Sequence, residues 1–232
     1  MTQEIKTINL GGVNCYLVNT GNGGFVLIDT GVSTKRTVLE KELENAGCQP
    51  GNLKLVILTH GDSDHAENCA YLRDRYATRI AMHVDDSGMV ERGDMSWNRK
   101  AKPDKVSIIF RILTLLFGLF VKPGKFDTFK PDIYLEDGQS LSEYGFNAQV
   151  LHLPGHSKGS IGILTAGGDS LAGLALFCGD LFYNIPGFLH IDNLADFNAS
   201  VKKLKSFDIS TVYPGHGKPF LMERLTKKSA NP

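Results

Sequence analysis

The sequence predicts a single domain of mixed strands and helices whose strand ends carry histidine and aspartate side chains. Three observations lead to this prediction. The chain has 232 residues, of which 42% are hydrophobic, and this suits one domain with an ordinary core. Short β-branched runs alternate with helical patterns along the chain. The apolar run 55–59 leads directly into His60, Asp62, Asp64 and His65, which are four candidate metal ligands.

Charge and cysteine usage narrow the class of protein. Lysine plus arginine and aspartate plus glutamate both total 25, so the formal net charge is zero and nothing favours nucleic acid or an anionic membrane. The four cysteines show no CxxC spacing, and two lie in apolar strand-like runs, where free buried thiols are common. The first residues lack a basic segment followed by an apolar core, so we expect a cytoplasmic protein.

Before residue 85 the chain alternates between strand-like and helix-like patterns. Strands are expected at 13–18, 25–29, 55–59 and 79–84, and helices at 34–46 and 66–76. The first helix would present Val38, Leu39, Leu43 and Ala46 on one face and end at Gly47. The ligand cluster would then lie in a loop just past a strand. We interpret His83 as a core or rim histidine rather than a ligand.

The segment 85–130 interrupts this alternation. Residues 85–105 are polar and irregular, whereas 106–121 are strongly apolar. The polar positions of the apolar run fall on one narrow stripe of a helix: Ser107, Arg111, Thr114 and Gly118. Sixteen residues with Arg111 in the middle are short for a membrane span. The helix could be buried in a subdomain, cover a site as a lid, form a homodimer interface or lie on a membrane surface. We expect 85–130 to be an inserted helical cap or lid.

After Pro131 the strand pattern returns. Strands are expected at 133–135, 148–153, 160–164, 175–178 and 211–213, a helix at 194–207, and a short basic helix at the C-terminus. His152 precedes His156 by four residues in a strand-like stretch, so we expect both side chains on the same face. His152 could support a site there or lie in the core.

Polar side chains recur at the ends of these strands. They are Asp29, the cluster His60, Asp62, Asp64 and His65, and then His156, Asp180 and His216. A glycine precedes each of the last three, and glycine lets the backbone turn closely beside a site. We therefore interpret these side chains as parts of one site.

These motifs resemble the metallo-β-lactamase superfamily over nearly the whole chain. The matching stretches, in the order typical of the family, are 13–17, 27–31, 60–65, 154–157, 178–180 and 214–217. The resemblance implies a single domain over 1–232, a four-layer αββα sandwich with two mixed sheets face to face and helices outside. It also implies a dinuclear metal site at one edge of the sheets.

The resemblance also implies a role for each matching position. His60 and His156 would bind the first metal, Asp64, His65 and His216 the second, Asp180 would bridge both, and Asp29 would support the site. The family's motif usually has a third histidine where this chain has Asp62. As a ligand, this carboxylate would make the first site harder and move its preference toward iron or manganese.

The chemistry of these side chains points to hydrolysis. Zinc accepts nitrogen and oxygen ligands, and two ions about 3.5–4 Å apart can share a hydroxide that is active near neutral pH. That hydroxide would be the nucleophile, with Asp64 able to orient it. Tyr183 follows Asp180 by three residues and could donate to a substrate oxyanion or serve packing. His190 lies further along the same loop and could approach the pocket.

We therefore expect a metal-dependent hydrolase with two divalent ions, zinc first, that cleaves an ester, thioester, lactone or related bond of a small molecule. The apolar run 106–121 favours a lipophilic substrate. A diiron oxidoreductase that reduces oxygen or nitric oxide with a separate electron donor is one alternative. A non-catalytic metal-binding module is another.

Overall fold

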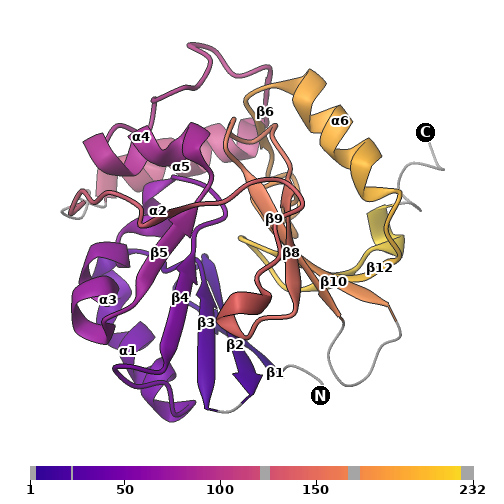
Figure 1. Ribbon diagram of the computed structural model, residues 1–232. Coiled ribbons are helices and arrows are strands. Elements are labelled where there is room, and N and C mark those ends of the chain that lie inside the picture. Colours follow the sequence, from indigo (N-terminus) through magenta and orange to yellow (C-terminus); the bar gives the residue numbers. More distant parts are fainter. Residues whose placement is uncertain (1–3, 22, 121–125, 167–172, 226–232) are drawn as a thin grey trace.

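Two β-sheets lie face to face, and helices cover the outer side of each sheet (Figure 1). The computed structural model describes residues 4–21, 23–120, 126–166 and 173–225. The first sheet has the order β1-β2-β3-β4-β5-β7 and the second has the order β13-β12-β10-β9-β8. This arrangement is the four-layer αββα sandwich that the sequence predicts.

The strands of each sheet have the following bounds. The first sheet contains β1 (Glu4–Asn9), β2 (Asn14–Gly21), β3 (Gly24–Ile28), β4 (Leu53–Ile57), β5 (Arg79–Met82) and β7 (Ile133–Tyr134). The second contains β8 (Ala148–His152), β9 (Ile161–Ala166), β10 (Leu174–Gly179), β12 (Ile209–Pro214) and β13 (Phe220–Leu221). The short strands β6 (Lys105–Val106) and β11 (His190–Ile191) pair with each other. The sequence interpretation missed β1, β6, β11 and β13.

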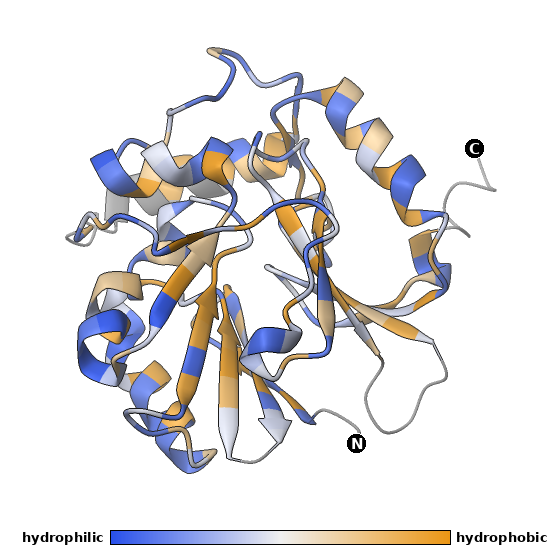
Figure 2. Ribbon diagram, viewed as in Figure 1, coloured by the Kyte–Doolittle hydropathy of each residue, from blue (hydrophilic) through white to orange (hydrophobic). Residues whose placement is uncertain are grey.

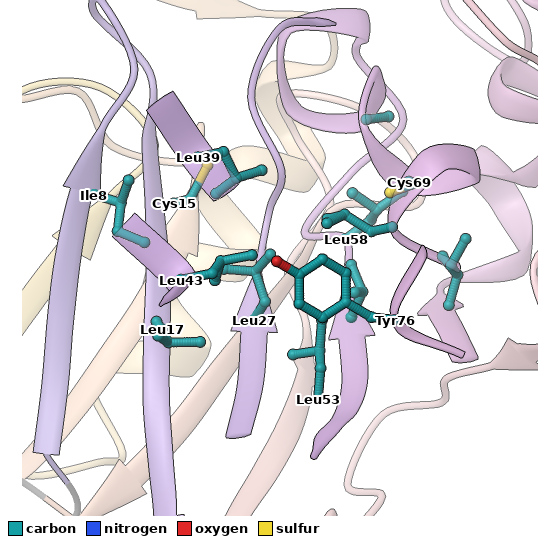
Figure 3. Close-up of a cluster of buried hydrophobic side chains, with 14 of the residues drawn as sticks. Ile8, Cys15, Leu17, Leu27, Leu39, Leu43, Leu53, Leu58, Cys69 and Tyr76 are labelled. Atoms are coloured by element: carbon teal, nitrogen blue, oxygen red, sulfur yellow. The ribbon is translucent and has the colours of Figure 1, made fainter. Parts of the chain in front are cut away.

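Three hydrophobic cores separate the four layers, and strand alternation creates them. In β3, Leu27 packs toward the outer helices while Val26 and Ile28 pack between the sheets. The outer core of the first sheet gathers strand residues and helix residues such as Leu43 and Tyr76 (Figure 3). Figure 2 shows hydrophobic residues along the strands and hydrophilic residues on the helices that cover them. Alternation therefore gives each sheet two buried faces.

Helices connect and cover the strands. They are α1 (Arg36–Asn45), α2 (Ser63–Ala66), α3 (Cys69–Tyr76), α4 (Val84–Arg92), α5 (Ile108–Phe120) and α6 (Leu194–Leu204), with 3-10 turns at Ser33–Lys35 and Ser142–Tyr144. The helix expected at 66–76 is instead divided between α2 and α3. The division follows from Glu67 and Asn68, whose side chains bond the segment 30–33. The expected C-terminal helix falls mainly outside the described residues.

The segment 85–130 differs from the prediction in two respects. Residues expected to be irregular form α4, which begins after His83, whose side chain accepts a hydrogen bond from the backbone N–H of Asp85. The helix expected at 106–121 is present as α5, but three of its apolar side chains are largely exposed: Ile108, Ile112 and Leu115. It is therefore not a helix buried on all sides. In the part of the chain that the structure describes, no helix has the length and hydropathy needed to cross a bilayer.

The packing of α1 yields a stability prediction. Leu43 is fully buried against the first sheet, whereas Val38 on the same helix is 45% exposed. We expect Leu43→Ala to lower the free energy of unfolding by about 2–5 kcal/mol, because it leaves a cavity in a packed core. Val38→Ala should change it by less than about 1 kcal/mol. Urea unfolding followed by circular dichroism measures the free energy of unfolding of both variants. Equal losses in the two variants would contradict the packing of α1 described here.

Candidate metal centre

Seven polar side chains converge where strand ends of the two sheets meet. They are His60, Asp62, Asp64, His65, His156, Asp180 and His216. Strands β3 and β4 are parallel to each other, and so are β10 and β12, so their carboxyl ends share an edge. Not all of these residues lie in loops, because Asp64 and His65 belong to the short helix α2.

The first group of ligand atoms comes from His60, Asp62 and His156. Asp62 Oδ2 lies 2.9 Å from His156 Nε2 and 3.4 Å from His60 Nε2. The rings of His60 and His156 meet edge to face, with centroids 4.8 Å apart. Two imidazole nitrogens and one carboxylate oxygen thus point to a common place.

The second group comes from Asp64, His65 and His216, with Asp180 beside it. His216 Nε2 lies 3.4 Å from Asp64 Oδ2 and 3.3 Å from Asp180 Oδ2. Asp180 Oδ1 lies 3.4 Å from His65 Nε2. The same carboxylate approaches the first group, at 3.9 Å from His156 Nε2. Asp180 is therefore the side chain placed to reach both groups.

All four histidines of the centre present Nε2 to it, because the protein occupies each Nδ1. The partners of Nδ1 are the Thr59 hydroxyl for His60, the Asp29 carboxylate for His65, the His190 carbonyl for His156 and the Gly12 carbonyl for His216. Such outer hydrogen bonds fix the tautomer and orientation of metal-binding imidazoles. The arrangement therefore suits coordination through Nε2.

Buried polar atoms test whether this set fits a metal ion. His60 Nε2, His65 Nε2 and Asp180 Oδ1 are buried and have no hydrogen-bond partner. Leaving such an atom unpaired costs about 1–3 kcal/mol, so three of them in one place call for a partner. Divalent ions that accept nitrogen and oxygen ligands, one at each group, would satisfy all three atoms, and the residues present fit such ions.

Opposite charges shift the pKa values of the centre. Burial alone would raise the pKa of Asp180, but His216 and His65 hold it well below its usual range. Burial would likewise lower the pKa of His216, but Asp180 and Asp64 raise it to about 10. Protonated histidines thus balance the carboxylates. Because a metal-binding imidazole must be neutral, ion binding would release these protons.

Asp29 supports the centre from the end of β3. Its carboxylate is 1% exposed and accepts hydrogen bonds from the backbone N–H and the hydroxyl of Thr59, each at 2.8 Å. It also lies 3.0 Å from His65 Nδ1. Gly215 permits equally close packing on the other side, because a Cβ there would collide with Asp180 and His65.

Tyr183 and His190 both reach the centre. The Tyr183 hydroxyl donates to Asp180 Oδ2 at 3.0 Å and lies 3.1 Å from His156 Nδ1. This contact positions Asp180, so the hydroxyl is not free as an oxyanion donor in this arrangement. The His190 ring lies 5.1 Å from that of His156, and burial lowers the pKa of His190 to about 4.

His152 does not support the centre, contrary to one of the two predicted roles. Its ring stacks on His83 at 4.1 Å, and Nε2 bonds the Lys158 carbonyl at 2.9 Å. The chain turns at Gly155, with a φ of 144°, so strand alternation does not extend from His152 to His156. The two stacked rings are within 4° of parallel, so their nitrogen lone pairs do not converge on one ion.

Two charged residues of the 85–130 segment reach the centre without any signal in the sequence. Asp86 is buried and accepts hydrogen bonds from Gly61 N–H at 3.2 Å, the Ser157 hydroxyl at 2.6 Å and Gly159 N–H at 2.7 Å. It thereby ties the loop of His60 to the loop of His156. The second residue, Arg99, pairs with Asp62.

Comparison with known proteins identifies the family of this chain. A family model described as the metallo-beta-lactamase superfamily matches residues 8–216. The chain belongs to this superfamily. The resemblance expected from the sequence is therefore confirmed.

Two curated members of the superfamily illustrate its range. The hydroxyacylglutathione hydrolase GloC of Haemophilus influenzae is 29% identical over 165 residues, which cover 71% of this chain and 66% of that protein. The acyl-coenzyme A thioesterase MBLAC2 of Bos taurus is 25% identical, over 81% of this chain and 63% of that protein. This chain thus spans slightly less than two thirds of the length of either relative.

Solved structures confirm the fold. The subclass B3 metallo-beta-lactamase BJP-1 of Bradyrhizobium japonicum matches 100% of this chain and 80% of its own, with a TM-score of 0.69 and 18% identity. A metallo-beta-lactamase of Cronobacter sakazakii matches 98% of this chain and 81% of its own, with a TM-score of 0.67 and 19% identity. At these identities the likeness establishes the fold alone.

The hydrogen bonds of Asp29 yield a metal-binding prediction. Asp29→Asn retains an oxygen for Thr59 and tolerates the positive φ of 59°, but it replaces the charged partner of His65. We expect zinc affinity to fall by roughly 10–100-fold, the usual effect of losing such a partner. Chelator competition measures it, with Asp132→Asn as the control because Asp132 bonds the backbone N–H of Ile80 instead. Equal affinity in both variants would refute the role of Asp29.

Proposed function

We propose that this chain is a metal-dependent hydrolase that cleaves acyl thioesters, within a wider class that includes esters and lactones. The observation that carries the proposal is the convergence of four histidine Nε2 atoms and three carboxylates, several of them buried and unpartnered, at one edge of the sheets. The relatives described above support the bond type, because a hydroxyacylglutathione and an acyl-coenzyme A both join an acyl group to a thiol.

Each group of ligands would hold one divalent ion, and zinc is the ion that we expect. When bound, the two ions would supply a hydroxide at neutral pH and polarise the carbonyl oxygen of the substrate. Asp64 is the most exposed carboxylate of the centre, at 38%, and so can orient the attacking water. Asp180 lies between the groups, and Tyr183 fixes one of its oxygens.

The position of α5 supports a substrate with an apolar acyl group. In α5, Phe110 packs on Phe188 at 4.7 Å and stacks on His190 at 5.1 Å, and His190 in turn contacts the ring of His156. Phe110 and Phe188 thus form an apolar wall beside His190, whereas the exposed side chains of Ile112 and Leu115 lie on the opposite side of α5. An acyl chain that leaves the centre past His190 would therefore meet an apolar surface.

A second candidate function is redox chemistry at two iron ions with a separate electron donor. The observation that favours it is the third carboxylate, Asp62, because hard oxygen ligands suit iron. Iron in the purified protein together with a redox-active absorption spectrum would favour this function. Zinc together with thioester hydrolysis would exclude it.

Metal removal tests the hydrolase. We expect dialysis against a chelator to reduce the hydrolysis of a short-chain acyl thioester at least 100-fold, and added zinc to restore it, because the protein supplies no other nucleophile in this proposal. Asp64→Asn should lower kcat at least tenfold. If the metal-depleted protein still hydrolysed the thioester at the original rate, the proposal would be refuted. Asp132→Asn, away from the centre, serves as the control.

The apolar face of α5 yields a prediction about selectivity. Phe110→Ala should lower kcat/KM for a long-chain acyl thioester about tenfold relative to a two-carbon one, because Phe110 is the α5 side chain beside His190 and an apolar side chain that becomes buried contributes about 1.5–3 kcal/mol. Val38→Ser, at an exposed position on α1, should leave the ratio unchanged. A ratio unaffected by the α5 change would show that the acyl chain binds elsewhere.

A further inference from the structure

Arg99 reaches the candidate metal centre from the stretch between α4 and α5. Its side chain is 11% exposed, and Nη2 donates to Asp62 Oδ1 at 2.7 Å. Nη1 donates to the backbone carbonyl of His156 at 3.4 Å. A fixed positive charge beside a cation site repels the ion, so its contact with the Asp62 carboxylate must serve another purpose at this position.

The two oxygens of Asp62 face different partners. Oδ1 is bonded to Arg99, whereas Oδ2 lies 2.9 Å from His156 Nε2 and 3.4 Å from His60 Nε2. The guanidinium also approaches the ring, with Nη2 3.5 Å from His156 Nε2. Only Oδ2 therefore points to the place where the two imidazole nitrogens meet, and Oδ1 is already occupied.

We propose that Arg99 is a positioning residue that makes Asp62 a one-oxygen ligand of reduced charge, and that it thereby preserves a zinc preference at the first group. A carboxylate free to use both oxygens is a hard ligand and suits manganese or iron. Pairing with a guanidinium offsets its charge and occupies one oxygen. Two imidazole nitrogens and one oxygen remain, a donor set that zinc accepts. The inference rests on the proposed metal centre.

A purely structural role for Arg99 would have a different signature. If Arg99 only anchored the segment 93–104 beside the centre, its removal would weaken the binding of every ion to a similar degree. If it tunes Asp62, its removal changes the affinity of one ion relative to another. The ratio of zinc to manganese affinity therefore separates the two roles.

The test measures this ratio on the full chain by chelator competition with zinc alone and with manganese alone. His60→Ala identifies the binding step that belongs to the first group. We expect Arg99→Gln to lower the zinc-to-manganese affinity ratio of that step at least tenfold and to leave the other binding step unchanged.

Two further variants serve as controls. Arg99→Lys keeps the charge and should retain most of the affinity ratio. Lys102→Gln is the matched control, because Lys102 is an exposed cation on the same stretch.

Asp62→His provides the decisive background. With no carboxylate at position 62, Arg99→Gln should no longer lower the ratio, and circular dichroism melting confirms that each variant is folded. An unchanged ratio in Arg99→Gln, or the same fall in the Asp62→His background, would overturn the inference and leave the metal centre standing. Failure of the parent chain to bind either ion would overturn the proposed centre itself.

Discussion

The buried Asp29 carboxylate is the interaction on which the centre depends. Asp29 adopts a φ of 59°, a left-handed conformation that costs a non-glycine residue about 1 kcal/mol or more. Hydrogen bonds to Thr59 and His65 offset this cost and are possible only because the chain turns there. One side chain thus joins the end of β3, the end of β4 and the helix α2. The strained position therefore lies beside the candidate metal centre.

The positions of the other candidate ligands follow from sheet topology. Strands β8, β10 and β12 run in the same direction in the second sheet, so the residues that follow them emerge at one edge. The core between the sheets, which includes Tyr16 and Phe177, brings that edge against the edge of the first sheet. Tyr16 also donates from its hydroxyl to the Pro214 carbonyl at 2.6 Å. The same packing that stabilises the sandwich therefore assembles a site from residues more than 150 positions apart.

Local patterns predict some parts of this molecule and not others. The convergence of the strand-end side chains could be predicted because each follows a short apolar run. The break between α2 and α3 could not, since it arises from long-range bonds of Asn68 to the segment 30–32. Asp86 and Arg99 could not either. Both lie in a polar stretch with many charges, and nothing local distinguishes the two that turn inward.

The described residues of the segment 85–130 contact this site at several points. Asp86 connects the two loops that carry the first group of ligands, Arg99 contacts the carboxylate of that group, and Phe110 packs on His190 next to it. The segment therefore contacts the candidate ligands Asp62 and His156 directly through Arg99. If the proposals for Arg99 and for the acyl chain hold, a change in this segment would alter ion preference and substrate preference together, because the two contacts lie on one stretch of chain.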